Sequence, residues 1–386
     1  MRAGLTAILA TATVWLAGCA MAPAPNTLSE ARDAAVLAQA RRVADWQLAH
    51  LDSFEGVSTF RDHTADPIDW IQATFYAGLA DLADATGDTG YAQAVIAHGQ
   101  AAGWDFHQDR PRHADADAIG HAWVWSAAKA QGEERVHRLA PIRSRFDAVA
   151  AAPSDASMIF DEKGGERACQ VRWCWSDAVF MAPPVWTALS KLTGDPRYTL
   201  HADRELKATI ATLYDADAHL FYRDSRFIGR LDDHGRKIFW SRGNGWAYAG
   251  LARVLETLPE EHASRATYET LFRQMSDALI ATQGPEGYWP VSLLDPVSPP
   301  ETSGTAFFVY GLAWGVNAGL LDQTTYGSAV ARGQAALDKA IQPDGRLGWV
   351  QQVGYAPDRV SPNDTQLYGV GAYLMAASQV SRRADW

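Results

Sequence analysis

The sequence predicts an all-α fold, an (α/α)6 barrel in which six helical hairpins close into a toroid. Apolar residues recur at three- and four-residue spacing, as in Ile71, Phe75, Leu79 and Leu82. A pattern of helix, break and second helix repeats along the chain, and no linker rich in Pro, Gly or Ser divides residues 30–386. The terminal repeats lack the polar outer faces of an open solenoid, which favours closure into one domain.

Small residues mark the first helix of each hairpin, and in most hairpins a Gly or Pro then breaks the chain before the second helix. The marked positions are, in order, 78–80, 119–121, 186–189, 250–252, 311–313 and 369–371. The breaks at 86–88 and 193–195 read Thr-Gly-Asp, in which Gly suits a left-handed helix end and Asp can cap the next helix. Long loops before the inner helices should build a cleft at one end of the barrel: 106–118, 160–177, 221–245 and 287–305.

The N-terminus has the features of a lipoprotein signal peptide. Arg2 precedes an apolar stretch, 5–16, that is too short to span a bilayer as a stable helix. The segment 1–19 ends in Leu-Ala-Gly-Cys, which looks like a bacterial lipobox in which the Cys19 thiol takes the lipid. We therefore expect a tether over 20–34, a folded domain over 35–386, and an exported protein anchored at the periplasmic face of the outer membrane or at the cell surface. An ordinary secretory peptide is the alternative.

The composition excludes some partners. With 386 residues, 47% of them hydrophobic, the chain can bury a large core, and its formal net charge of -11 disfavours nucleic acid or an anionic membrane surface. No HExxH or paired CxxC motif is present, so no metal is expected. In an exported protein Cys169 and Cys174 either form a short-range disulfide or remain thiols.

The aromatic content points to carbohydrate. The chain has 15 Trp and 13 Tyr. Sugar rings stack their C–H faces on indole, while polar neighbours bind the hydroxyls. Interleaved Arg residues would repel a cationic ligand, which makes an aromatic cage for choline the weaker interpretation. The Trp residues in polar, loop-like surroundings are Trp173, Trp175, Trp240, Trp246, Trp289 and Trp349.

Two segments place carboxylates at the mouths of inner helices. Asp177 follows two Trp residues and opens an apolar helix, a setting that removes water and raises a carboxyl pKa toward that of a general acid. Asp115 and Asp117 lie in the segment that begins at His113 and could supply a second carboxylate facing the same sugar. Simple helix capping is the alternative for each Asp.

Two further segments offer binding groups. In 239–246, Arg242 has a planar fork suited to a carboxylate, although an ion pair with a neighbouring Asp would explain it equally simply. In 301–306, hydroxyl groups precede another inner helix, and helix capping is again the alternative.

At these motifs the chain resembles the unsaturated rhamnogalacturonyl hydrolase family, which is related to the unsaturated glucuronyl hydrolases. The resemblance spans about 35–380. Its marks, in order, are the HAD segment at 113, W-x-D-x-x-F-M-A-x-P at 175–184, W-x-R-x-x-G-W at 240–246, E-T-S-G-T at 301–305 and D-x-x-x-x-G-x-G-A-Y at 364–373.

The resemblance implies the (α/α)6 barrel, no metal or cofactor, and catalysis by Asp177 with a second aspartate from the HAD segment. Relatives often read HADD there, so Asp115 is the preferred partner and Asp117 the alternative. A family histidine expected before the W-x-R-x-x-G-W motif is replaced by Tyr222 and Arg223. The other implied substrate-binding residues are His113, Arg172, Trp175, Trp240, Arg242, Trp246, Thr302, Ser303 and Thr305.

The implied reaction is hydrolysis of the terminal 4,5-unsaturated uronic acid that polysaccharide lyases leave on pectin-type oligosaccharides. Protonation at C4 and addition of water at C5 would give a hemiketal that opens and expels the remaining sugar. Arg242 is the first choice for the substrate carboxylate, then Arg172 and Arg112.

Three alternatives remain: an unsaturated glucuronyl hydrolase for another polysaccharide, a different (α/α)6 enzyme such as a conventional glycosidase, epimerase or lyase, and a non-catalytic cell-surface sugar-binding lipoprotein. The carboxylates at the helix mouths favour an enzyme.

Overall fold

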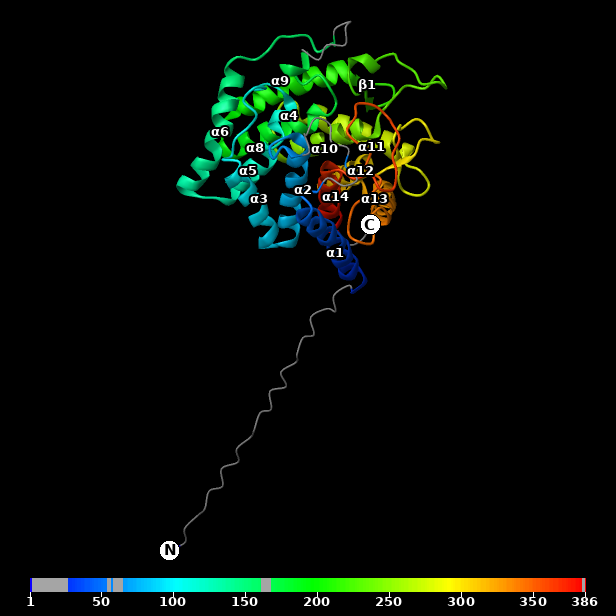
Figure 1. Ribbon diagram of the computed structural model, residues 1–386, viewed down its shortest axis with the longest axis horizontal. Coiled ribbons are helices and arrows are strands. Elements are labelled where there is room, and N and C mark those ends of the chain that lie inside the picture. The colour runs from blue at the N-terminus through cyan, green and yellow to red at the C-terminus, as the bar shows by residue number, and fades with distance from the viewer. Residues whose placement is uncertain (2–26, 54–56, 58–64, 161–167, 384–385) are drawn as a thin grey trace.

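Helices form an inner and an outer ring in the computed structural model, which describes residues 1, 27–53, 57, 65–160, 168–383 and 386 (Figure 1). The inner helices are α2 (Trp70–Thr86), α5 (Gly120–Lys129), α8 (Pro183–Thr193), α10 (Ser241–Thr257), α12 (Thr302–Asn317) and α14 (Leu367–Val380). The outer helices are α1 (Thr27–Ala49), α3 (Thr89–Ala101), α6 (Gly132–Ala151), α9 (Pro196–Leu213), α11 (Arg265–Thr282) and α13 (Gln323–Lys339).

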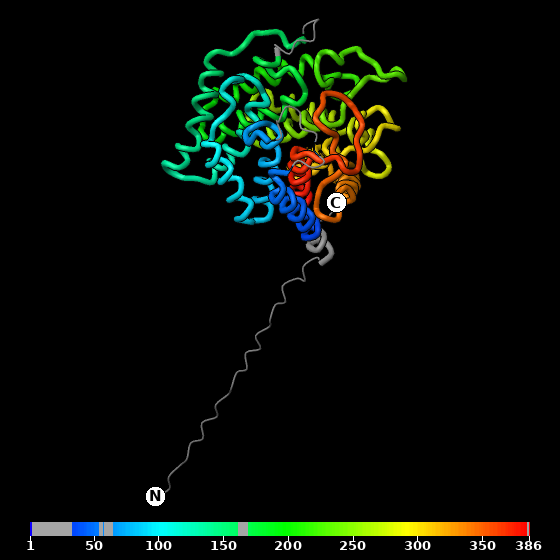
Figure 2. Tube along the Cα trace, in the orientation of Figure 1, coloured from blue at the N-terminus to red at the C-terminus, as the bar shows by residue number. Residues whose placement is uncertain are grey.

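The inner helices close on themselves. Each packs against the next, from α2 through α5, α8, α10 and α12 to α14, and α14 packs back against α2. Figures 1 and 2 show the red C-terminal helix beside the blue start of the ring. Each inner helix also contacts its own outer partner, with α1 pairing with α14. The predicted (α/α)6 barrel is therefore confirmed.

Burial separates the two rings. All residues of α14, and all of α12 except the last, are buried, whereas α11 and α13 bury only part of their surface. A helix that is apolar on every side belongs inside a protein, whereas one with an apolar stripe belongs on the surface. The small residues allow close approach within the ring, since a Cβ on Gly78 would lie 2.2 Å from the carbonyl oxygen of Gly371.

Some boundaries differ from the predicted ones. Helix α1 begins at Thr27, inside the predicted tether 20–34. Helices α10 and α12 begin inside the predicted loops 221–245 and 287–305. Several candidate site residues consequently lie in the first turns of inner helices, where their side chains compete for helix-capping roles. Cys19 lies outside the described residues.

Short extended segments hold the loops at the site end. Strand β1 (Tyr214–Asp215) pairs antiparallel with β2 (Leu220–Phe221), and β3 (Trp289–Pro290) pairs antiparallel with β4 (Pro300–Glu301). Isolated bridges join Trp175 to Asp224 and Trp240 to Ser292. These pairings hold the loop before α10 against the loops before α7 (Ala178–Met181) and α12.

Cys169 and Cys174 form a disulfide, with their Cα atoms 5.1 Å apart, which resolves the alternative that the sequence left open. No helix in the described part of the chain is long and apolar enough to cross a membrane.

Candidate active site

Asp177 lies directly before helix α7 at one mouth of the barrel. Its side chain is 12% exposed. Oδ1 accepts a hydrogen bond from the Ser176 hydroxyl at 3.3 Å, and Oδ2 lies 3.3 Å from Nε of Arg223. Gly243 of α10 packs against this corner, where a Cβ would approach the Ser176 hydroxyl to 3.0 Å. The carboxyl is therefore held on one side and retains a small open edge on the other.

Burial raises the pKa of Asp177, and the negative charge of Asp115 raises it further. The guanidinium groups of Arg223 and Arg242 oppose this shift, as does the Ser176 hydroxyl. A carboxyl whose pKa is raised by lost hydration can hold a proton and donate it, which is the property required of a general acid.

Asp115 and Asp117 share the short helix α4 (Ala114–Asp117) but have different surroundings. Asp117 is buried, accepts from Arg145 Nε at 3.0 Å, and accepts from the Trp186 indole at 2.9 Å. The Asp115 side chain is 19% exposed and lies close enough to Asp177 to affect its pKa. The geometry thus supports Asp115 over Asp117 as the second carboxylate.

His113 contacts both Asp115 and Trp175 at this corner. Its Nδ1 accepts from the backbone N–H of Asp115 at 3.2 Å, and its ring packs edge-on against Trp175 at 5.1 Å. Both rings are buried, so they shape the site more than they expose a surface for stacking.

Asp69 is a third carboxylate at this mouth, immediately before α2. Burial raises its pKa to about 7, assisted by the charge of Asp115 and opposed by Arg110. Arg110 Nη2 lies 3.7 Å from Oδ1 of Asp69, and His107 Nε2 lies 4.0 Å from the same oxygen. Asp69 was not among the residues predicted from the sequence, although it opens an apolar inner helix as Asp177 does. The adjacent Trp70, which is partly exposed and stacks on Tyr368, was missed as well.

Arg223 lies between Asp177 and the buried Asp224. Its Nη1 donates to Asp224 Oδ2 at 2.9 Å, and its guanidinium lies 4.9 Å from the centre of the Trp175 ring. The backbone fixes this position, because the N–H of Ser176 donates to the carbonyl of Arg223 at 2.8 Å. Arg223 thus occupies the stretch in which the family histidine was expected.

The guanidinium of Arg242 does not face the cleft, which corrects the prediction that Arg242 is the first choice for binding the substrate carboxylate. The residue is only 1% exposed, and its terminal nitrogens donate to the carbonyls of Gln351 and Gln352 at 2.6 and 2.9 Å. The guanidinium packs between the rings of Trp240 and Tyr368. Trp240 is buried as well and donates its indole N–H to the Gln351 side chain at 2.7 Å. Arg242 is therefore a fixed buried charge that binds the loop before α14.

Four more residues that were predicted to bind substrate are buried and make contacts within the protein. Trp246 is buried and packs against Phe180 and Phe307. The three hydroxyl groups at the start of α12 are buried and donate to nearby oxygens. Thr302 donates to the carbonyl of Gly348, Ser303 to the carboxylate of Glu301, and Thr305 to the carbonyl of Glu301. Helix capping, the simpler alternative, therefore accounts for this motif, with Glu301 as the cap.

Arg172 and Arg112 are not available to a ligand beside Asp177. Arg172 pairs with Glu205 at 2.7 Å and donates to the carbonyl of Ala156. Arg112 donates to the carbonyl of Ala152. Among the described residues, no group of three or more His, Cys, Asp or Glu side chains could hold a metal ion.

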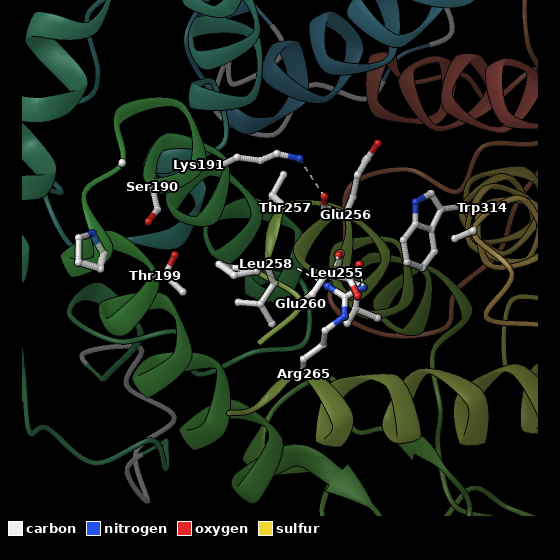
Figure 3. A pocket seen from close by; sticks show the side chains of 14 residues that line it. Ser190, Lys191, Thr199, Leu255, Glu256, Thr257, Leu258, Glu260, Arg265 and Trp314 are labelled. Atoms are coloured by element: carbon white, nitrogen blue, oxygen red, sulfur yellow. Dashed lines mark hydrogen bonds and ion pairs between the residues drawn. The ribbon is translucent and has the colours of Figure 1, made fainter. Parts of the chain in front are cut away.

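The opposite mouth of the barrel has a cavity of about 650 Å³ (Figure 3). It is lined by the C-terminal ends of inner helices α8, α10 and α12 and by the starts of outer helices α9 and α11, and its two basic side chains donate to backbone carbonyls. Lys191 donates to the carbonyl of Glu256 at 3.3 Å, and Arg265 donates to the carbonyl of Leu258 at 2.8 Å. The predicted site residues Asp177, Asp115 and Arg242 do not line this cavity.

Comparison with known proteins gives consistent matches over nearly the whole folded region. A family model described as Glycosyl Hydrolase Family 88 matches residues 38–384. The chain is similar to a protein of Alteromonas sp. (strain LOR) named unsaturated 3S-rhamnoglycuronyl hydrolase, with 38% identity over 347 residues, 87% of this chain and 83% of the relative.

Two solved structures are similar with a TM-score of 0.77 each. One is titled as a glycosyl hydrolase family 88 protein from Bacteroides vulgatus, at 28% identity over 91% of this chain and 99% of the other. The second is titled as a polysaccharide lyase, at 29% identity over 91% of this chain and 98% of the other.

Proposed function

Since the chain belongs to Glycosyl Hydrolase Family 88 and is therefore a glycosidase, we propose that it releases a terminal 4,5-unsaturated uronic acid from oligosaccharides. The observation that carries the proposal is the corner built by Asp177, Asp115 and Arg223. A buried carboxyl with a raised pKa lies there beside a second carboxylate and a cation. An acid, a negative charge to stabilise positive charge at the reacting carbon, and a partner for the uronate carboxylate are what this chemistry requires.

The proposed reaction consumes one water. The Asp177 carboxyl transfers its proton to C4, the electrons of the double bond form the C4–H bond, and positive charge develops at C5 and the ring oxygen. Water adds to C5 and returns a proton to Asp177, giving a hemiketal. The hemiketal opens by breaking the bond between C5 and the ring oxygen, which leaves a ketone at C5 and a hemiacetal at C1. The hemiacetal then expels the remaining sugar as an alcohol. The negative charge of Asp115 would stabilise the positive charge that develops at C5 and the ring oxygen.

Rhamnose is the sugar that we propose next to the uronic acid. The Alteromonas relative is named for a rhamnoglycuronyl substrate, and the resemblance noted in the sequence is to rhamnogalacturonyl hydrolases. Fragments of the pectin type fit the same description. A panel of unsaturated uronyl disaccharides with rhamnose, galacturonate or glucose as the second sugar tests this choice, and the highest kcat/KM should be found with rhamnose.

The near-ultraviolet absorbance of the C4–C5 double bond provides a direct assay. The purified protein should abolish this absorbance in lyase-generated oligosaccharides and release a free reducing sugar in equal amount. If the absorbance persists while saturated oligosaccharides are cleaved, the protein is a conventional glycosidase. If neither substrate changes while oligosaccharide still binds, it is a binding protein.

A polysaccharide lyase is the second candidate, because one of the similar solved structures carries that title. A lyase would create the double bond, so absorbance would rise when the protein is mixed with an intact uronic acid polysaccharide. The same assay therefore distinguishes the two reactions by the sign of the change.

We also propose that the protein is exported and lipid-anchored through Cys19, on the basis of the signal-like segment 1–19. Replacement of Cys19 by Ser should move the protein from the membrane fraction to a soluble fraction, because acyl chains supply about 0.8 kcal/mol of membrane affinity per buried CH₂ group. Unchanged fractionation would refute the anchor.

A further inference from the structure

The substrate of the proposed reaction carries a carboxylate that must bind close to Asp177. Its carboxylate is attached to C5, next to the C4 atom that receives the proton. When C4 lies against the Asp177 carboxyl, the substrate carboxylate must also lie close to Asp177. The protein carries a net charge of -11, and Asp115 adds negative charge to this corner, so a nearby cation has to compensate.

Two guanidinium groups are among the largest influences on the pKa of Asp177, those of Arg223 and Arg242. Arg242 is 1% exposed and donates from both terminal nitrogens to backbone carbonyls. A substrate could reach it only by displacing the loop that carries Gln351 and Gln352. Arg223 is the accessible cation of the two, with a side chain 12% exposed, equal to that of Asp177.

The hydrogen bonds of Arg223 leave one edge unused. Nε faces Asp177 and Nη1 faces Asp224, while Nη2 makes no hydrogen bond to the part of the chain that the structure describes. The ring of Trp175 lies along the guanidinium and restricts its rotation. Asp224 is buried and also pairs with Arg226, so the Nη1 side is anchored. Nη2 is thereby left as a donor on a guanidinium whose other contacts hold it in place.

We propose that Arg223 is the residue that binds the uronate carboxylate and thereby orients C4 toward Asp177. The inference rests on the proposed function and goes beyond it by assigning substrate recognition to a residue that replaces the expected histidine. A charged hydrogen bond from Nη2 would provide affinity, and the contact of Nε with Asp177 would fix the distance between the two carboxyl groups.

The arrangement also couples binding to protonation. In the free protein Arg223 opposes the rise in the pKa of Asp177, as do Arg242 and Ser176, whereas burial and Asp115 promote it. A bound uronate would share the charge of Arg223 and place a second negative charge beside Asp177. Both effects favour the protonated form of Asp177. Substrate binding would therefore promote uptake of the proton that Asp177 later transfers to C4.

The test compares two substrates that differ only in this carboxylate, an unsaturated uronyl disaccharide and its methyl ester. The wild-type protein should prefer the acid in kcat/KM. Arg223→Gln should reduce that preference by about 10- to 100-fold, the range for a hydrogen bond to a charged group. The intrinsic reactivity of the ester cancels, because each variant is measured with both substrates. Arg226→Gln is the matched control, since Arg226 pairs with the same Asp224, and it should keep the wild-type preference.

An unchanged acid preference in Arg223→Gln would overturn the proposal. Activity of the wild-type protein on the acid tests the proposed function separately, so the two failures are distinguishable. If Arg223→Gln does not fold, as judged by circular dichroism, Arg223→Lys decides the question. Lys keeps the charge but loses the fork, so the acid preference should fall to an intermediate value, and a wild-type preference would count against the assignment.

Discussion

The two mouths of the barrel use charged side chains differently. At the site end, carboxyl groups stand before inner helices, and burial raises the pKa of Asp69 and Asp177. At the opposite end, burial also raises the pKa of Asp81 of α2, to about 6, but Asp81 forms an ion pair with Arg253 of α10, and Lys191 donates to a carbonyl at a helix end. Helix N-termini attract negative charge and C-termini require donors, so the same helices favour different residues at their two ends.

Glu301 shows that position at a helix N-terminus is not sufficient for chemistry. Its carboxylate accepts from the backbone N–H groups of Ser303, Gly304 and Gln351, at 2.7 to 3.0 Å, and is fully buried. Asp177 has only the Ser176 hydroxyl and Arg223 as hydrogen-bond partners in the described chain and keeps an open edge. A carboxyl whose lost hydration is only partly replaced by hydrogen bonds can react, whereas one with every acceptor site filled serves the structure, even when both stand before an inner helix.

The largest expected effect comes from replacing one carboxyl group at each mouth by an amide. Asp177→Asn should lower kcat by about 10²–10⁴-fold, because it removes the proton donor, with little change in thermal stability. Asp81→Asn should leave kcat unchanged and destabilise the fold by about 1–3 kcal/mol, because Arg253 loses its partner. Loss of double-bond absorbance and calorimetric unfolding measure the two effects. If Asp177→Asn retains more than a tenth of the wild-type rate, the acid lies elsewhere.

A second pair sharpens the comparison within one short helix. Asp115→Asn should lower kcat, because it removes the charge that supports the reacting carbon. Asp117→Asn should mainly lower stability, by about 3–5 kcal/mol, because it leaves Arg145 buried without its carboxylate. Kinetics and urea unfolding of both variants provide the check, and the reverse ranking would move the catalytic role to Asp117.

Asp69 makes the stability of the site end depend on pH. Its pKa is about 7 in the folded protein and near 4 in the unfolded chain, so the folded state binds the proton more tightly. Stability from this group is therefore complete below pH 4 and is lost as the pH rises to 7, by a few kcal/mol. Asp69→Asn should flatten this part of the profile, as measured by unfolding between pH 4 and 8. A parallel profile in the variant would show that Asp69 titrates normally despite its neighbours Asp115, Asp66, Arg110 and His107.

The smallest effect is expected at the α12 cap. Ser303→Ala removes a hydrogen bond of 2.6 Å to Glu301 and should cost about 1 kcal/mol of stability while KM stays unchanged. A clear rise in KM would indicate that the Ser303 hydroxyl binds substrate after all. It would also weaken the distinction between Glu301 as a structural carboxylate and Asp177 as a reacting one.

Local patterns were sufficient for much of this molecule. The apolar spacing and small residues of the inner helices predicted the closed barrel, because the helix period is set by neighbouring residues and small side chains let one helix pack closely on another. The same reasoning placed Asp177 and Asp115 at the mouth, since a carboxylate before an apolar helix is readable within a few residues. Asp69 satisfied that criterion and was overlooked.

The tertiary structure decided which charged group faces which. The sequence could not show that Arg242 donates to carbonyls 109 and 110 residues away, or that Arg223 reaches Asp177 across 46 residues. These partners meet only when the ring closes and the loop pairings form. A motif therefore determined the kind of side chain at each helix start, and three-dimensional packing determined whether that side chain was consumed by the fold or left with an edge open to a substrate.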